Sequence, residues 1–389
     1  MATLKNSRGK FFEVHKMPRD RTFWYYFFDR TGRLEELPEK HVSALASWRP
    51  ERSNCPELTE VIEDLIQNIP IEWRALANNI FVGRVLDGEA NAKAWTRVKA
   101  GIIEINLQYT FVLSAYVAAF DDYVRLSSSL LEKVLDPSEN MDEVVRALDD
   151  RLSEPRSWLD ESRPEWLDLR LLSSGNPALR RLTPPDRIDL LGNVVAACEE
   201  FAIAHELSHH LLWHTVSKSG KSKAWRTVDT AIDSAGIIDK LTGLNPSQIQ
   251  ELHADILAFM IMANAINGIA PFHRLYRALA GSMISHIALA DINESWIEKD
   301  DSASHPDFIA RCIVIAALAE WLSKSQHVGD VGDHPLGLLV QLQGFSALAI
   351  NAWLSRSFPD KVRRVNIADI ADHMLKLAAE AYQKIPANP

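Results

Sequence analysis

The sequence predicts a mainly α protein of the α+β class, in which many helices accompany a small antiparallel β element near the N-terminus. Two observations predict this class. From about Pro56 onward, apolar residues recur at spacings of three and four, which is the period of a helix with one buried face. Before Pro56, short aromatic and apolar stretches alternate with turn residues, a pattern typical of strands.

The first 50 residues are predicted to be the β-rich element. Turn residues at Pro18-Arg19-Asp20 and Thr31-Gly32 separate three stretches that we assign to short strands. These stretches are Lys10–Met17, Thr22–Asp29 and Arg33–Leu37. The aromatic residues of the second stretch favour an edge sheet packed on helices, and a peptide-binding platform is the alternative.

Residues 51–183 are predicted to be a helical region that ends in an acidic excursion. Helical spacing covers Leu58–Asn68, Ile71–Asn79 and a long segment from Ala92 to Val134. Residues 135–183 are rich in Pro, Asp, Glu and Ser. Because they also contain Leu and Trp, we interpret them as an excursion between two helical blocks and not as a simply disordered linker.

Residues 184–389 are predicted to form a helical domain. Its first helix begins after Pro184-Pro185, with apolar or small residues at helical spacing from Ile188 to Ala202. A second helix begins at Asn245-Pro246-Ser247, a capping residue followed by proline, and continues to about Ala265. The other predicted helices are Trp225–Leu241, Pro271–Ile297, His305–Ser323, Pro335–Arg356 and Ile367–Ile385.

The composition is that of an ordinary soluble protein. The chain has 389 residues, of which 47% are hydrophobic and 24% charged, enough for one large domain or two modest ones. A formal net charge of -10 argues against nucleic acid as a partner, because phosphate binding needs clustered Lys and Arg. Cys55, Cys198 and Cys312 are odd in number and far apart, which favours a reducing compartment. Because no secretion signal is apparent, we expect a cytoplasmic protein.

The stretch from Ala202 to His214 reads AIAHELSHHLLWH and contains the pattern H-E-x-x-H at His205, Glu206 and His209. Residues four apart return to nearly the same face of a helix, so the two imidazoles can bind one metal ion. Glu206 lies about a quarter-turn to the side, where it can act as general base on a water molecule at the metal. A single histidine on an apolar face is usually a hydrogen-bonded core residue, but two with a glutamate between them favour a zinc site.

A catalytic zinc site needs a third protein ligand. On a continuous helix, His210 points about 140° and His214 about 180° away from the first ligand, so both are expected to be surface or packing residues. Glu251 and Asp255 lie one turn apart on the helix that begins at Asn245. One of these carboxylates can bind the metal while the other accepts a hydrogen bond from the outer ring nitrogen of a ligating histidine. Glu251 is the better candidate ligand, and the apolar neighbours of both carboxylates indicate a partnered site.

The HELSH motif is followed by the pattern E-x-x-A-D-x-x-A, which begins at Glu251, and then by His305-Pro306 with Arg311 downstream. Together these motifs resemble the gluzincin metallopeptidases, and within them a soluble relative of the membrane-embedded HtpX-type peptidases. The resemblance covers the stretch from Ala202 to Arg311 and implies a zincin-like fold. It also implies roles for six residues: His205, His209 and Glu251 as Zn²⁺ ligands, Glu206 as general base, Asp255 as the orienter of a ligand and His305 as a donor to the oxyanion.

The sequence therefore predicts a zinc-dependent endopeptidase that acts on a protein or peptide. One alternative is a binding or regulatory protein with a structural zinc site, because His210, His214 and His253 offer further ligands. The other is a membrane-associated peptidase anchored by Leu336–Ser355, an uncharged run of spanning length. Polar residues in that run, and the shortness of a second uncharged run at Ile105–Phe120, favour buried helices over membrane spans.

Overall fold

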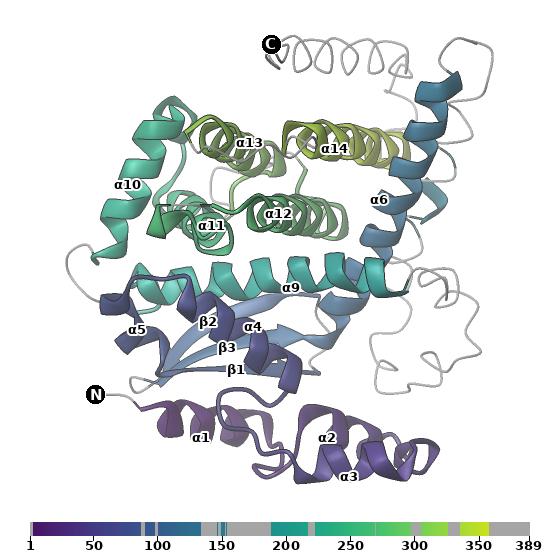
Figure 1. Cartoon of the computed structure of the whole chain (residues 1–389), viewed down its shortest axis with the longest axis vertical. Coiled ribbons are helices and arrows are strands. Elements are labelled where there is room, and N and C mark those ends of the chain that lie inside the picture. Colours follow the sequence, from purple (N-terminus) through teal and green to yellow (C-terminus); the bar gives the residue numbers. More distant parts are fainter. Residues whose placement is uncertain are drawn as a thin grey trace.

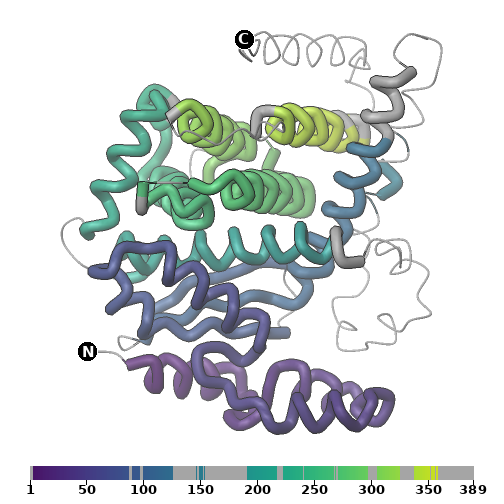
Figure 2. Tube along the Cα trace, in the orientation of Figure 1, coloured from purple at the N-terminus to yellow at the C-terminus, as the bar shows by residue number. Residues whose placement is uncertain are grey.

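The computed structural model describes most of the chain up to residue 357, and Figures 1 and 2 show its course. The described residues are 3–86, 90–97, 100–133, 146, 149–151, 153, 188–216, 222–268, 270–296, 305–325 and 335–357. The predicted helix Ile367–Ile385 and nearly all of the predicted excursion lie outside them. The described part is mainly helical with one small sheet, which confirms the predicted class, whereas the domain boundaries stay a prediction.

Helices make up most of the described elements. They are α1 (Leu4–His15), α2 (Phe23–Arg30), α3 (Glu39–Ser47), α4 (Pro56–Gln67), α5 (Ile71–Ala77), α6 (Leu107–Lys133), α9 (Ile188–Leu211), α10 (Ala224–Ala235), α11 (Pro246–Met262), α12 (Phe272–Ile292), α13 (Phe308–Ser325) and α14 (Pro335–Ser357). The strands are β1 (Ile80–Val85), β2 (Ala92–Arg97) and β3 (Ala100–Asn106), and short 3₁₀ turns are η1 (Leu34–Glu36), η3 (Ile238–Leu241) and η4 (Ala265–Asn267).

Helix α9 is central to the arrangement. It lies between the sheet on one side and α11 and α12 on the other, as Figure 1 shows. Helices α13 and α14 form the next layer, while α10 and α6 stand at the two ends. Nearly all buried apolar residues belong to one cluster that extends from Phe11 in α1 to Trp353 in α14. A site on α9 is therefore supported by packing on both sides of the helix.

The predicted N-terminal β element is wrong, because this region is helical. The stretches assigned to strands are occupied by α1, α2 and η1. The side chain of Thr22 caps α2 by accepting a hydrogen bond from the backbone N–H of Tyr25, and Thr3 caps α1 in the same way. In α2 only Phe23 and Phe27, four residues apart, are buried. The run of consecutive aromatic residues hid this helical period.

The sheet lies later in the chain than predicted. Its order is β1-β3-β2, with β1 parallel and β2 antiparallel to β3. Strand β1 was not predicted, and the helix predicted from Ala92 begins only at Leu107. The apolar run Ile102–Ile105 fits either a buried strand or a buried helix, since periodicity cannot separate the two over so few residues. Gly83 in β1 contacts the ring of Phe11, which packs α1 onto the sheet.

The long helices of the C-terminal half confirm the predictions closely. Helices α11, α13 and α14 begin and end near the predicted residues, and α4 and α5 do so in the earlier part, whereas α12 ends at Ile292, before the predicted Ile297. The predicted helix Trp225–Leu241 divides into α10 and η3, because Gly236 adopts a left-handed conformation (φ 66°) that ends α10. All three cysteines are free thiols.

One helix of the described part, α14, is long and apolar enough to cross a membrane by length and composition. The relevant window is Gly337–Leu354, and 59% of it is buried against the rest of the protein. A buried core helix satisfies the same criterion, so this single helix is weak evidence for a span. Helix α6, which holds most of the run at Ile105–Phe120, does not meet this criterion.

Candidate metal centre

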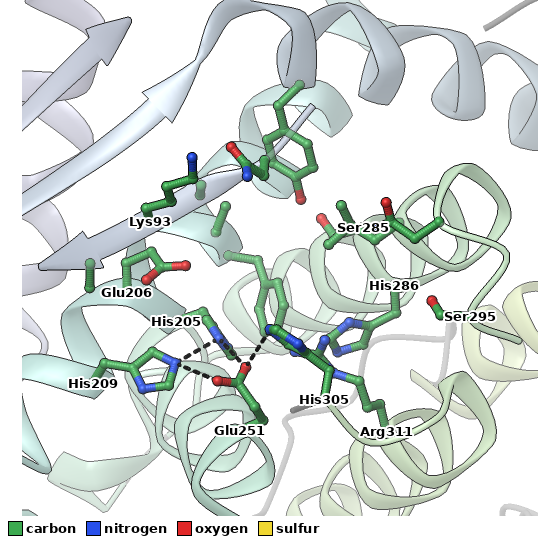
Figure 3. A pocket seen from close by; sticks show the side chains of 18 of the residues that line it. Lys93, His205, Glu206, His209, Glu251, Ser285, His286, Ser295, His305 and Arg311 are labelled. Carbon is green, nitrogen blue, oxygen red and sulfur yellow. Dashed lines mark hydrogen bonds and ion pairs between the residues drawn. The ribbon is translucent and has the colours of Figure 1, made fainter. Parts of the chain in front are cut away.

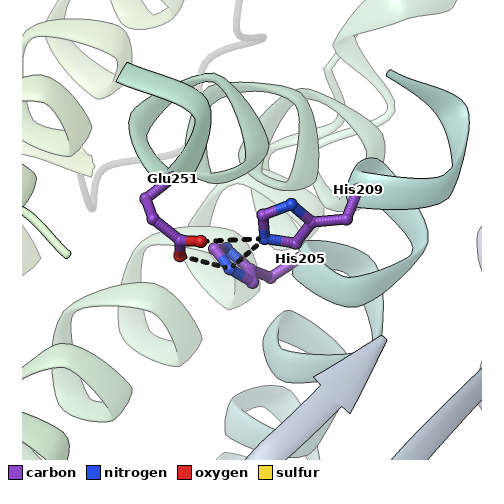
Figure 4. Close-up of side chains that lie close together, drawn as sticks. All are labelled: His205, His209 and Glu251. Atoms are coloured by element: carbon purple, nitrogen blue, oxygen red, sulfur yellow. Dashed lines mark hydrogen bonds and ion pairs between the residues drawn. The ribbon is translucent and has the colours of Figure 1, made fainter. Parts of the chain in front are cut away.

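Two helices present the candidate ligands. His205 and His209 lie one turn apart near the end of α9, and Glu251 lies in α11, which packs against α9. The first turn of α11 is fixed by a capping box. The side chain of Asn245 accepts from the backbone of Gln248 (3.0 Å), and the Gln248 side chain accepts in return from the backbone N–H of Asn245 (2.9 Å). This start directs Glu251 towards α9 (Figure 4).

The three side chains converge on a common point. His205 Nε2 lies 3.1 Å from His209 Nε2, and Glu251 places one carboxylate oxygen 3.3 Å from His205 Nε2 and the other 3.4 Å from His209 Nε2. A tetrahedral zinc site with bonds of about 2.0–2.1 Å has ligand-to-ligand edges of about 3.3–3.4 Å. Within the described part of the chain, these residues are the one group of His, Cys, Asp and Glu that fits a metal ion. The donor set, two imidazoles and a carboxylate, is one that zinc accepts.

Asp255 contacts the ring nitrogen of His205 that points away from the candidate metal position. Its fully buried carboxylate accepts from His205 Nδ1 (2.8 Å) and from Arg311 through Nε and Nη2 (both 2.7 Å). Burial alone would raise the pKa of Asp255, but the guanidinium group of Arg311 holds it well below its usual range. Burial alone would lower the pKa of His205, but Asp255 and Glu251 outweigh it and raise that pKa to about 10. Asp255 thus contacts His205, and its role as the orienter of a ligand stays a prediction.

The ring nitrogen of His209 that points away from the candidate metal position has a partner that the sequence did not predict. His209 Nδ1 lies 2.9 Å from His214 Nδ1. The expectation that His214 points away is wrong, because α9 ends at Leu211 and the chain reverses at Trp213, whose φ is 69°. Burial, followed by the neighbouring His209, lowers the pKa of His214 to about 3, so its ring is neutral. No glycine marks this reversal, and the sequence therefore carried no signal for it.

His210 and His253 are packing residues. His210 Nε2 donates to the carbonyl of Ile102 in β3 (3.1 Å), and burial lowers its pKa to about 4. This confirms the prediction for His210. His253 lies in α11 with its ring against Trp225, at a centroid distance of 4.5 Å. Neither belongs to the group that fits a metal ion.

The three candidate ligand residues line a cavity of about 900 Å³. Its walls come from residues 90–94, which include the start of β2, and from α9, α11, α12 and α13. Figure 3 shows the carboxylate of Glu206 directed into this cavity on the side nearer to Lys93 of β2. Glu206 is not one of the three converging residues, as its quarter-turn offset predicted.

His305 lies on the opposite side of the group. Its Nε2 is 3.6 Å from a carboxylate oxygen of Glu251, and its imidazole, 62% exposed, faces the cavity (Figure 3). The structure thus brings together all six residues singled out in the sequence. The role of His305 as an oxyanion donor stays a prediction.

Two further residues, Arg311 and His286, contact the site, and the sequence predicted no role for either of them. Arg311 stood in a sequence motif, but its pairing with Asp255 needed the approach of α13 to α11. His286, in α12, places Nε2 3.7 Å from Asp255 and packs its ring against Phe201. Burial lowers the pKa of His286 to about 3. A lone histidine in an apolar helix carries no signal that separates it from an ordinary core residue.

Comparison of the chain with protein-family models, curated proteins and solved structures finds no match in any of the three.

Proposed function

We propose that this protein is a zinc-dependent endopeptidase in which His205, His209 and Glu251 hold the metal. The observation that carries the proposal is the convergence of these donor atoms, which lie within 4.8 Å of one another, beside the Glu206 carboxylate in one cavity. The proposal includes a zincin-like arrangement, a cytoplasmic location and a relationship to the gluzincins.

The residues of the chain divide the chemistry among them. A bound zinc ion supplies a Lewis acid that polarises a carbonyl group and lowers the pKa of a water molecule. Glu206 accepts the proton of the attacking water and passes it to the leaving amine. His305, whose ring faces the cavity, donates a hydrogen bond to the oxyanion. Asp255 and Arg311 keep the ring of His205 in place during these steps.

The shape of the cavity favours a polypeptide as the substrate. One wall is β2, which lies at the edge of the sheet with β3 as its neighbour, and the opposite wall is α12. An edge strand offers backbone groups with which an extended peptide can pair. A space of about 900 Å³ between them accommodates several residues of such a peptide.

A structural metal site is the competing function. His305 favours it, because its Nε2 lies 3.6 Å from Glu251 and a small movement brings it to the metal as a fourth ligand. Replacing His305 with alanine separates the two. In a peptidase this variant keeps its zinc and loses hydrolysis, whereas in a structural site it loses zinc affinity and stability together.

The experiment that tests the proposed function compares wild type and Glu206→Gln expressed in parallel. New peptide N-termini across the proteome are counted in both, and zinc content is measured on the purified chains. We expect new N-termini with wild type alone, equal zinc in both chains, and a loss of about 10²–10⁴-fold in rate for the variant on any substrate found. Identical N-termini in the two samples would remove the peptidase assignment.

A further inference from the structure

Each candidate ligand imidazole has one ring nitrogen towards the metal position and one away from it. For His205 the outer nitrogen meets the Asp255 carboxylate, and for His209 it meets His214 Nδ1 at 2.9 Å. Both outer contacts are at hydrogen-bond distance. The outer nitrogen of His209, the second candidate ligand, therefore contacts His214, a residue to which the proposed function assigns no role.

The chain after α9 is built to place His214. Trp213 adopts a left-handed conformation (φ 69°), which disfavours any residue with a Cβ atom. The turn is kept nonetheless, because the backbone N–H of His214 donates to the carbonyl of His209 (2.9 Å) and that of Leu212 donates to Ser208 (2.8 Å). This reversal returns His214 to the side of His209, which a continued helix would not do.

Neighbouring contacts fix the turn and the ring. Thr215 Oγ1 lies 3.0 Å from both His210 Nδ1 and Thr96 Oγ1, which ties the turn to α9 and to β2. On the other side, the ring of Trp225 meets the His214 ring edge-on at a centroid distance of 5.8 Å. Trp225 is itself held by a hydrogen bond from Nε1 to the carbonyl of Leu212 (3.2 Å). The His214 ring is thus confined between the turn and α10.

The proton positions in this pair follow from the ligand role of His209. A neutral imidazole that offers Nε2 to a metal carries its proton on Nδ1, so His209 Nδ1–H donates. His214 Nδ1 must then be the acceptor, and its own proton lies on Nε2. We propose that His214 is a positioning residue that accepts this hydrogen bond and holds the Nε2 lone pair of His209 towards His205 and Glu251. This inference rests on the proposed zinc site and deepens it.

The test uses zinc alone as the probe. It compares two His214 variants whose new side chains have similar lengths. His214→Gln keeps an acceptor oxygen at this position, whereas His214→Met has no strong acceptor. Zinc affinity is measured by competition with a chromophoric chelator, and the visible spectrum of the Co²⁺-loaded chains reports on ligand geometry. His253→Phe is the control, because His253 packs its ring against the same Trp225 but lies outside the group that fits a metal ion. Circular dichroism and the midpoint of thermal unfolding verify the fold.

We expect H214M to bind zinc about 10–100-fold more weakly than wild type and to change the Co²⁺ spectrum, with H214Q closer to wild type and H253F unchanged. Equal affinities and spectra in H214M and wild type would overturn the positioning role while the zinc site stands. A wild-type chain that binds no zinc would overturn the proposed function and this inference together. If H214M does not fold, His214→Phe serves as the acceptor-free variant and the same comparison decides.

Discussion

Glu251 and Glu206 line the same cavity but have different expected effects on zinc. Glu251 lies within 3.4 Å of both imidazoles, whereas Glu206 is outside the converging group. We expect Glu251→Gln to lower zinc affinity at least about 10-fold, because a neutral amide is a poorer ligand than a carboxylate. Glu206→Gln, the same substitution in the same cavity, is the matched control and keeps wild-type affinity. Zinc titration of the two variants checks this, and the reverse order of affinities would exchange their roles.

Arg311 is the main positive partner of a carboxylate with no access to solvent. Asp255 is 0% exposed, and Arg311 contacts both of its oxygens. We expect Arg311→Met to destabilise the protein by about 3–5 kcal/mol, because it leaves a buried charge without its cation. The control is Lys324→Met in the same helix, where the pair with Glu320 is exposed and contributes less than about 0.5 kcal/mol. Denaturant titration measures the free energy of unfolding of both variants. Equal losses of stability in the two would contradict the expected difference.

At the scale of elements, the approach of α12 to α9 positions the wall of the cavity. A Cβ atom at Gly281 would lie 2.3 Å from the carbonyl oxygen of Ala197 in α9, closer than atoms pack. We expect Gly281→Ala to lower the free energy of unfolding by about 1–3 kcal/mol, because the new methyl group would meet backbone atoms of α9. Gly192→Ala, in α9 with open space around it, is expected to add about 0.5–1 kcal/mol of stability. Thermal unfolding of both variants checks the signs, and a stabilised Gly281→Ala would show that the two helices are not this close.

The elements also show which parts of the fold were predictable. α9 and α11 could be predicted because each combines a long helical period with a marked beginning, and the H-E-x-x-H spacing then placed three site residues. The sheet could not, since the short apolar run of β3 has no distinctive period. The contact of His214 with His209 depends on a helix that stops at Leu211 without a glycine, and only the folded chain reveals it.

Across the whole molecule, a buried ion pair connects the sheet to the central helix. Arg84 of β1 contacts both oxygens of Glu199 in α9, at 2.9 and 3.2 Å, and Thr110 of α6 also donates to this carboxylate. Burial alone would raise the pKa of Glu199, but Arg84 and Thr110 lower it below its usual value. The folded protein therefore binds this proton less readily than the unfolded chain does.

This pair has a consequence for stability against pH. Because the folded-state pKa of Glu199 is lowered, its contribution is present above the unfolded value of about 4.3 and is lost as the pH falls below that value. We expect Glu199→Gln to be less stable than wild type at pH 7 and to approach wild type as the pH falls towards 3. Unfolding free energies of the metal-free chains, measured by urea titration at several pH values, check this. Parallel curves for the two proteins would contradict it.

The central claim concerns a single ion held by two helices, α9 and α11. X-ray absorption at the zinc edge, recorded on zinc-loaded wild type and on Glu251→Gln, tests it most directly. The ligand assignment predicts one zinc per chain, two imidazole nitrogens together with oxygen donors in wild type, and an altered coordination shell in the variant. A wild-type chain without stoichiometric zinc, or identical spectra from the two chains, would contradict it.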